Sequence, residues 1–320
     1  MYLDKRVLLI AGGGTLGTYV ASELLRLGAI VEVICPEEKV SHNSRLIFHQ
    51  SLATTELLED LFSRNHYHGI VNFIHYKSVE EYAPVHRLLI RNTDHLIFLS
   101  SYRVYADLQH PITESAPRLT EVISDPAFLE TEDYAVPKSR CEDFLRSSCQ
   151  GEPWTIVRPV ISFSQKRLDL LMASGRQVLE LAARKEILYL PKLAKDFTAG
   201  LDWAGNSGKL IANLLFREET IGDTFTIYSG HKTTWGEVAD IYQKRIGLQV
   251  CWCDEAEYLE RNPDIQESKW WTWVFDRRFN RDVDCSKVLN ATGLTAQDFV
   301  SVEQGILKEL NIIRTMETEI

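Results

Sequence analysis

The start of the sequence lacks a long apolar run, because only about five apolar residues precede the first glycines. Such a run is far too short for the core of a signal peptide or for a membrane-spanning helix. We therefore expect a cytoplasmic protein with no membrane partner.

A surplus of basic residues is also lacking. Lys and Arg number 35 against 45 Asp and Glu, so the formal net charge is −10. Acids and bases are mixed along the chain rather than gathered in blocks, which disfavours nucleic acid and anionic membranes as partners. A local basic pocket for one phosphorylated ligand remains compatible with this balance.

The cysteines form no metal-binding pattern. Most of the six are scattered, and Cys251 and Cys253 have one residue between them instead of two, with no second pair of ligands. We expect no metal site and reduced, structural thiols. No run of Gly, Ser or Pro marks a linker, so any second lobe should pack closely on the first.

What the sequence does contain is an alternation of short apolar runs and helical stretches. Strands are expected at residues 6–10, 29–35, 45–49, 69–74, 95–100 and 154–159, and helices at 55–64, 79–91 and 134–147. This alternation predicts an α/β fold, a doubly wound parallel sheet of the Rossmann type. We assign 1–165 to the NAD(P)-binding domain, 166–312 mainly to a smaller mixed α/β substrate-binding lobe with segments returning to the sheet, and 313–320 to a frayed tail.

A glycine turn follows the first expected strand. Gly12, Gly14 and Gly17 have the G-x-G-x-x-G spacing and precede a helical stretch. The first glycine allows a tight turn, the second lets a pyrophosphate approach the backbone, and the third lets the helix pack on the strand. With Thr15 and Leu16 between them, these residues indicate a dinucleotide site.

The residue expected to bind the adenosine ribose departs from this pattern. An acid usually ends the second strand, but Cys35 occupies the position. Glu37 and Glu38 follow within reach and would repel a 2′-phosphate, while the nearest bases are Lys39 and Arg45. We therefore favour NAD as the cofactor and leave NADP open.

Further motifs follow the glycine turn in a fixed order. "SSYRVY" contains Ser101, "YAVPK" runs from Tyr134 to Lys138, and "TIVRP" ends at Pro159. In this order they resemble the extended short-chain dehydrogenase/reductase superfamily, in its nucleotide-sugar epimerase and dehydratase branch, over roughly residues 5–310. The resemblance implies that Ser101, Tyr134 and Lys138 are catalytic, and that Lys138 and Pro159 also contact the cofactor.

Elementary chemistry agrees with these roles. A tyrosine, with an unperturbed pKa of about 10, can take a proton from an alcohol only if its phenolate is stabilised. Lys138, one helical turn from Tyr134, would supply that charge and bind the nicotinamide ribose, and Ser101 would hydrogen-bond the reacting oxygen. Pro137 between them fits the first turn of a helix that Thr131 or Asp133 caps.

Two departures from the family narrow the function. Tyr102 and Arg103 stand where related dehydratases and decarboxylases carry acids, so elimination and decarboxylation are disfavoured. The leading hypothesis is an NAD-dependent epimerase that acts on a nucleotide-activated sugar or polyol through a transient ketone. An NAD(P)H-dependent reductase of a keto nucleotide sugar is the alternative, and a non-catalytic NAD(P)-binding sensor or scaffold is a further one.

The resemblance also implies contacts that the residues themselves leave open. Phe73 stands beside the cofactor, where the family usually has small residues. Lys195 and either Arg278 or Arg281 would bind the substrate diphosphate, or else form surface ion pairs. The helix after residue 77 is shorter than the family's dimerisation helix, which leaves a homodimer open. The roles of Arg103 and of Trp270, Trp271 and Trp273 are not assigned.

Overall fold

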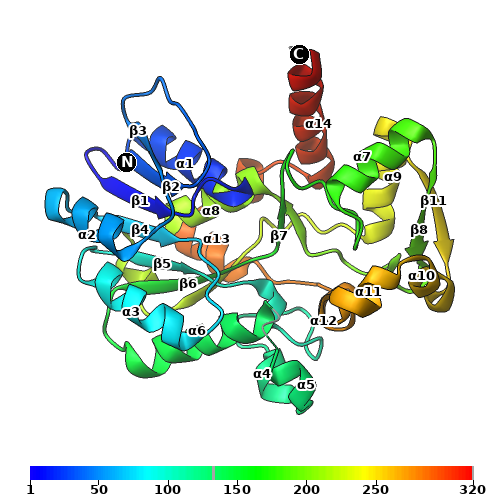
Figure 1. Cartoon of the computed structure of the whole chain (residues 1–320), viewed down its shortest axis with the longest axis horizontal. Helices are drawn as coiled ribbons and strands as arrows, with labels where there is room; N and C mark the ends of the chain where they lie inside the picture. The colour runs from blue at the N-terminus through cyan, green and yellow to red at the C-terminus, as the bar shows by residue number, and fades with distance from the viewer. Residues whose placement is uncertain (132–133, 319–320) are drawn as a thin grey trace.

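In the computed structural model, which describes residues 1–131 and 134–318, a seven-stranded parallel sheet organises one side of the molecule (Figure 1). The strand order is β10–β6–β5–β4–β1–β2–β3. The strands are β1 (Arg6–Ile10), β2 (Ile30–Cys35), β3 (Leu46–Gln50), β4 (Gly69–Asn72), β5 (Leu96–Leu99), β6 (Trp154–Pro159) and β10 (Thr224–Ile227). This arrangement confirms the doubly wound α/β fold predicted from the alternation of strands and helices.

Helices cover both faces of the sheet. The helices around it are α1 (Thr15–Arg26), α2 (Thr55–Arg64), α3 (Val79–Ile90), α6 (Ala135–Ser148), α8 (Ala204–Leu214) and α13 (Ser286–Thr292). Because strand side chains alternate between faces, Val7 and Leu9 of β1 pack in the core under α1, α8 and α13, whereas Leu8 and Ile10 pack under α2 and α3. Coverage of both faces explains why these strands read as continuous apolar runs.

The second lobe extends from the carboxyl edge of the sheet, at the right of Figure 1. Two small parallel pairs build it, β7 with β9 and β8 with β11. Its elements are β7 (Ile161–Phe163), α7 (Gly175–Arg184), β8 (Ile187–Pro191), β9 (Leu201–Trp203), α9 (Trp235–Ile246), β11 (Gln249–Cys253), α10 (Glu255–Arg261), α11 (Pro263–Ser268), α12 (Trp270–Thr272), the π-turn η4 (Trp273–Arg277) and α14 (Val302–Thr318). A core shared by β7, α7, α9 and the segment after β5 joins this lobe to the sheet domain.

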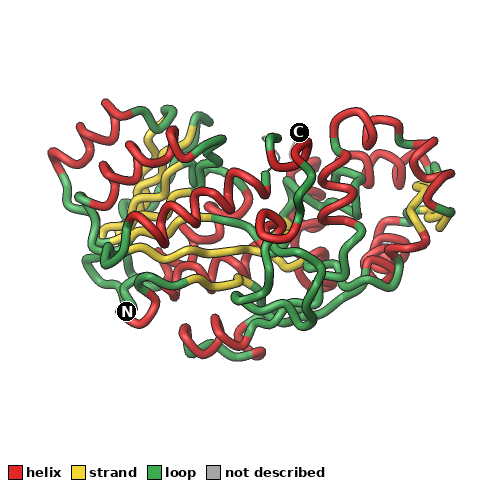
Figure 2. The backbone as a smooth tube through the Cα atoms, turned by 90° about the horizontal axis from the view of Figure 1, so that it is seen from below, coloured by secondary structure: helices red, strands yellow, loops and turns green. Residues whose placement is uncertain are grey.

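Short helical segments connect the larger elements. They are η1 (Tyr102–Val104), α4 (Leu119–Val122), α5 (Pro126–Leu129), η2 (Lys192–Ala194), η3 (Glu218–Thr220) and η5 (Ala296–Asp298). Figure 2, turned from the first view, shows the strands of the main sheet on one side and loops running between the two lobes. In the described part of the chain, no helix is both long enough and apolar enough to cross a membrane.

The C-terminal segment differs from the expectation of a frayed tail. Helix α14 continues to Thr318, and only residues 319–320 of the predicted tail lie outside the described residues. The buried carboxylate of Glu309 anchors this helix, because it accepts hydrogen bonds from Tyr19 Oη, from Trp203 Nε1 at 2.5 Å and from the Gln165 amide at 2.7 Å. The anchor lies upstream of residue 313, so the tail continues a helix that is already held.

Candidate active site

A cavity of about 370 Å³ opens at the carboxyl ends of β5 and β6. Ligands of open α/β sheets bind at this edge. Among the described residues, its lining consists of Thr15, Leu16, Leu99, Ser100, Ser101, Tyr102, Arg103, Tyr134, Pro159, Val160, Ile161, Ser162, Arg167, Thr272, Asp276 and Arg277. The structure therefore brings together Thr15, Leu16, Ser101, Tyr134 and Pro159, which the sequence analysis had assigned from separate motifs.

The glycine turn between β1 and α1 forms one end of this region. A Cβ atom at Gly17 would lie 2.3 Å from the carbonyl oxygen of Gly12, so only glycine lets the helix approach the turn this closely. A Cβ at Gly14 would meet none of the described atoms within 4 Å, which leaves space in front of the helix N-terminus. Free space and helix amides together suit a phosphate group.

A carboxylate two residues after Cys35 lies beside the glycine turn. The Glu37 Oε2 atom would lie 2.8 Å from a Cβ atom placed on Gly13, so the side chain folds back over the glycine turn. Lys39 reaches the same turn, where its Nζ donates to the Gly13 carbonyl at 2.6 Å. Cys35 is buried and its thiol contacts the Glu37 carbonyl at 3.5 Å. An acid and a base thus stand together where the adenosine ribose is expected.

Tyr134 and Ser101 face the cavity from two different elements. Ser101 begins η1, and its Oγ accepts from the Arg103 amide at 3.2 Å. Tyr134 is the N-cap residue of α6, and its ring centroid lies 4.7 Å from that of His75. Burial raises the pKa of the Tyr134 phenol, while the nearby guanidinium groups of Arg103 and Arg167 act in the opposite direction. The phenolate form therefore depends on neighbouring cations.

Lys138, together with Arg103, is one of the cations beside the Tyr134 ring. Its side chain is only 1% exposed, and its Nζ lies 5.6 Å from the centroid of the Tyr134 ring. The Nζ donates to the carbonyls of Ile74, at 3.0 Å, and of Leu99, at the ends of β4 and β5. Burial lowers the pKa of Lys138 to about 8. An ammonium group has three protons, so one remains for the phenolate or for a ribose hydroxyl.

The proline inside the motif is accommodated as predicted. Helix α6 starts at Ala135, so Pro137 lies in its first turn, where a missing amide proton costs little. Of the two caps proposed for this helix, Thr131 donates its hydroxyl to the Phe128 carbonyl at 2.7 Å, and Asp133 lies outside the described residues. Tyr134 and Lys138 thereby stay one helical turn apart.

A buried ion pair holds the middle of α6 against the sheet. Glu142, four residues after Lys138, accepts from Arg158 of β6, with Nε to Oε1 at 2.8 Å and NH2 to Oε2 at 2.5 Å. Both side chains are buried. Although burial opposes ionisation, Arg158 and its neighbours hold the pKa of Glu142 at about 2. This pair fixes the helix that presents Tyr134 and Lys138.

The residues predicted to bind the diphosphate are not among the described residues that line the cavity. Lys195 is exposed, with its Nζ 5.8 Å from the Trp252 ring centroid. Arg278 pairs with Glu255 at 3.3 Å. Arg281 is buried and donates to the backbone carbonyls of Tyr105, at 2.9 Å, and Phe275, at 3.1 Å.

Arg277 and Asp276, which the sequence analysis did not select, line the cavity instead. Buried Asp276 accepts from the Tyr102 hydroxyl at 2.6 Å and is surrounded by Arg103, Arg277 and Arg281. These arginines keep the pKa of Asp276 below its usual value even though burial acts against them. The π-turn η4, which contains a kink at Phe275, directly precedes Arg278. The cluster of arginines after residue 276 was the sequence feature that could have pointed to Arg277.

The remaining predicted residues pack outside the cavity lining. Phe73 is half-buried against the core beneath α1 and α8, and Cys35 lies in the same core. The tryptophans also pack: Trp273 is fully buried, and Trp271 stacks on Phe275 with centroids 5.6 Å apart. Trp270 is partly exposed. Packing therefore accounts for Trp271 and Trp273.

Solved structures of other proteins share the fold of this chain, although their sequences differ widely from it. A scan of protein-family models finds no match, and a search of curated proteins finds none either. Solved structures do match. The UDP-glucose 4-epimerase of Thermotoga maritima, solved with UDP-glucose, has a TM-score of 0.69 at 16% identity, over 97% of this chain and 99% of that one. The chain has the fold of this epimerase.

Other structures of the same fold carry different ligands or functions. MoeE5, solved with UDP-glucuronic acid and NAD, has a TM-score of 0.68 at 13% identity, over 97% of this chain and 99% of that one. The terminal R domain of the myxalamid PKS-NRPS pathway has a TM-score of 0.66 at 17% identity, over 98% and 92%. These matches confirm the fold implied by the resemblance to the extended short-chain dehydrogenase/reductase superfamily.

Proposed function

We propose that the chain is an NAD-dependent epimerase that acts on a nucleotide-activated sugar or polyol. The observation that carries this proposal is that Ser101 and Tyr134 line the same cavity as Thr15 and Pro159, with the Lys138 ammonium 5.6 Å from the Tyr134 ring. A nucleophile or metal is not needed for this chemistry, because it consists of the removal of one hydride and one proton and the return of both.

The residues around the glycine turn suit the cofactor. Gly14 and the first turn of α1 would bind the pyrophosphate, and Glu37 would accept from a ribose hydroxyl. NAD, when bound, would take a hydride from the substrate carbon and return it to the opposite face. NAD is bound in the solved structure of MoeE5, which shares this fold.

Proton transfer would be the task of Tyr134. As phenolate, it would remove the proton of the substrate hydroxyl while Ser101 hydrogen-bonds the same oxygen, and it would return the proton after the hydride comes back. Lys138 would lower the cost of the phenolate. Arg103, in place of an acid, can neither donate a proton for loss of water nor accept one, so the ketone would return to an alcohol.

The charge of the cavity wall supports an anionic substrate. Arg103, Arg167 and Arg277 line it, against the single carboxylate of Asp276 among the described lining residues. Guanidinium groups match the geometry of phosphate and carboxylate oxygens. We propose Arg167 and Arg277 as contacts of the charged part of the substrate, in place of Lys195, Arg278 and Arg281.

A reductase is the second candidate, and Lys39 is the observation that favours it. Its Nζ at the Gly13 carbonyl could approach a 2′-phosphate, which would suit NADPH and a reaction that consumes it. The R domain of the myxalamid pathway shows that the fold is not confined to epimerases. A sensor or scaffold without catalysis is the remaining alternative.

The cofactor that copurifies with the protein separates these candidates. The purified chain should retain NAD, detected by mass spectrometry, and should convert UDP-glucose or UDP-glucuronic acid to a stereoisomer without added coenzyme. Stoichiometric oxidation of added NADPH without isomerisation would establish the reductase instead. Retained cofactor without turnover of any nucleotide sugar would favour the sensor.

A further inference from the structure

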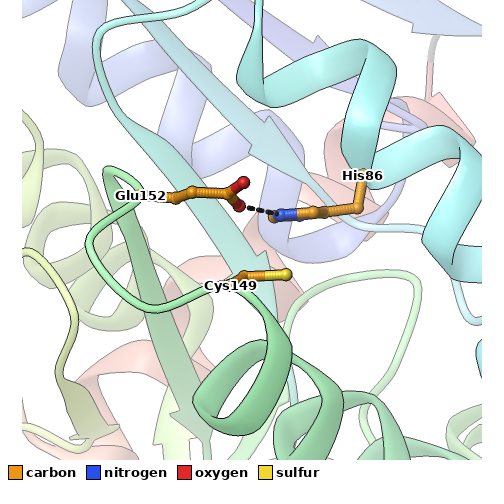
Figure 3. A group of neighbouring side chains, drawn as sticks. All are labelled: His86, Cys149 and Glu152. Atoms are coloured by element: carbon orange, nitrogen blue, oxygen red, sulfur yellow. Dashed lines mark hydrogen bonds and ion pairs between the residues drawn. The ribbon is translucent and has the colours of Figure 1, made fainter.

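A group of metal-ligating side chains lies far from the cavity, at the opposite edge of the sheet. His86 comes from α3, and Cys149 and Glu152 come from the loop between α6 and β6 (Figure 3). One possible ligand atom of each, the imidazole nitrogen, the sulfur and a carboxylate oxygen, lies within 4.8 Å of the other two. It is the single such group among the described residues.

We propose that His86, Cys149 and Glu152 form a binding site for a divalent transition-metal ion of the Zn²⁺ class. One nitrogen, one sulfur and one oxygen ligand suit a borderline-soft cation. Tetrahedral bonds of about 2.0–2.3 Å place the ligand atoms roughly 3.3–3.8 Å apart, so His86 Nε2 and Glu152 Oε2, now 2.7 Å apart, would separate to admit the ion. Water would complete a tetrahedral shell. The sequence analysis expected no metal site, because it considered the spacing of the cysteines and not the distant His86 that the fold brings beside Cys149 and Glu152.

The surroundings of His86 support this role. Its Nε2 atom points at Glu152 Oε2, 2.7 Å away, as Figure 3 shows, while its Nδ1 atom lies 3.2 Å from the Tyr82 hydroxyl. Metal-bound histidines usually have their second nitrogen held by such a partner, which fixes the tautomer and the ring orientation. Tyr82 is itself fully buried, so the ring has little freedom to turn away.

Charge balance favours an ion of charge two. When the metal binds, the Cys149 thiol loses its proton to solvent and a metal–sulfur bond forms, so thiolate and carboxylate together neutralise the cation. A thiol is mainly protonated at neutral pH until a metal ion binds its sulfur. Each bound ion should therefore release one proton.

The structure indicates how an ion would reach the site and what its binding would do to the protein. The Glu152 side chain is 39% exposed, which gives an ion a path from solvent to the buried Cys149 and His86. A metal would link α3 to the loop that joins α6 and β6. It should therefore raise the stability of the fold without taking part in reactions at the distant cavity.

The experiment uses the full chain after removal of metals with a chelator. Zn²⁺ should raise the melting temperature, and Co²⁺ should produce a thiolate-to-cobalt charge-transfer absorption together with release of one proton. Cys149→Ser should abolish that absorption and weaken Zn²⁺ binding by at least about tenfold, and Tyr82→Phe should weaken it by about tenfold.

The matched control is Cys141→Ser, which removes another buried thiol from the neighbouring helix and should leave cobalt absorption unchanged. Glu152→Gln, a partly exposed position, keeps the shape of the side chain and should weaken binding even if Cys149→Ser folds poorly. An absent thiolate band in the wild type would overturn the proposal. A band of equal strength in Cys149→Ser would do the same, since exposed Cys251 would then be its source.

Discussion

Replacing Lys138 by methionine should remove a pH-dependent contribution to the stability of the fold and should also reduce activity. The ammonium is buried, and its pKa falls from 10.5 to about 8. At 1.36 kcal/mol per pKa unit, the folded state is thereby penalised by about 3 kcal/mol at neutral pH. The folded-state pKa is depressed, so the unfolded chain binds more protons between pH 8 and 10.5, and stability should rise with pH in that window.

The size of this rise follows from the two pKa values. Between pH 7 and pH 9.5 the wild type should regain about 2 kcal/mol of unfolding free energy from Lys138 alone. Lys138→Met has the same other titrating groups but lacks this one, so the difference between the two proteins isolates it. The variant should also lose activity, because Tyr134 loses one of its neighbouring cations.

Urea unfolding of the cofactor-free proteins, followed by tryptophan fluorescence at several pH values, measures the difference. Lys244→Met, at an exposed position, is the control and should keep the pH dependence of the wild type. If Lys138→Met showed the same rise in stability as the wild type, the buried ammonium would not be the source of the pH dependence and the reasoning would fail.

Three further predictions concern the turn and the ion pair. Glu142→Gln should destabilise the fold by about 3–5 kcal/mol in urea, because it leaves Arg158 buried beside a neutral partner. Since the pKa of Glu142 is depressed to about 2, its stabilisation should disappear as pH falls from about 4.5 to about 2, and acid titration of wild type and Glu142→Gln should converge there. Gly17→Ala should destabilise the fold through its clash with Gly12, whereas Gly14→Ala should fold normally and bind NADH more weakly in a fluorescence titration. A Gly17→Ala protein of wild-type melting temperature would contradict this reading of the turn.

The sequence predicted the sheet well because most of its strands, though not the edge strand β3, are buried on both faces and therefore read as short apolar runs between turns. The relative position of Tyr134 and Lys138 could also be predicted, because the two residues lie one helical turn apart once Pro137 is placed in the first turn. The order of the motifs then predicted that Ser101 and Tyr134 lie at the same edge of the sheet, and both residues line the cavity there.

The other residues around the cavity and the glycine turn could not be predicted from the sequence in the same way. Arg277 lines the cavity and its neighbour Arg278 does not. The two residues lie at the end of the irregular π-turn Trp273–Arg277, whose geometry no simple sequence periodicity predicts. The Glu37 carboxylate lies beside the glycine turn because its side chain folds back over Gly13, which the sequence alone did not predict. The site of His86, Cys149 and Glu152 joins residues more than sixty positions apart, as the sequence separation of 66 between His86 and Glu152 shows, so only the fold reveals it.

The role of Tyr134 in proton transfer is the central claim, and the turnover of a Tyr134→Phe variant tests it most directly. With UDP-glucose or UDP-glucuronic acid, isomerisation should fall by about 10²–10⁴-fold while NAD stays bound. Tyr189→Phe, in the second lobe, serves as the matched control and should retain the wild-type rate. An equal rate in Tyr134→Phe and wild type would contradict the account.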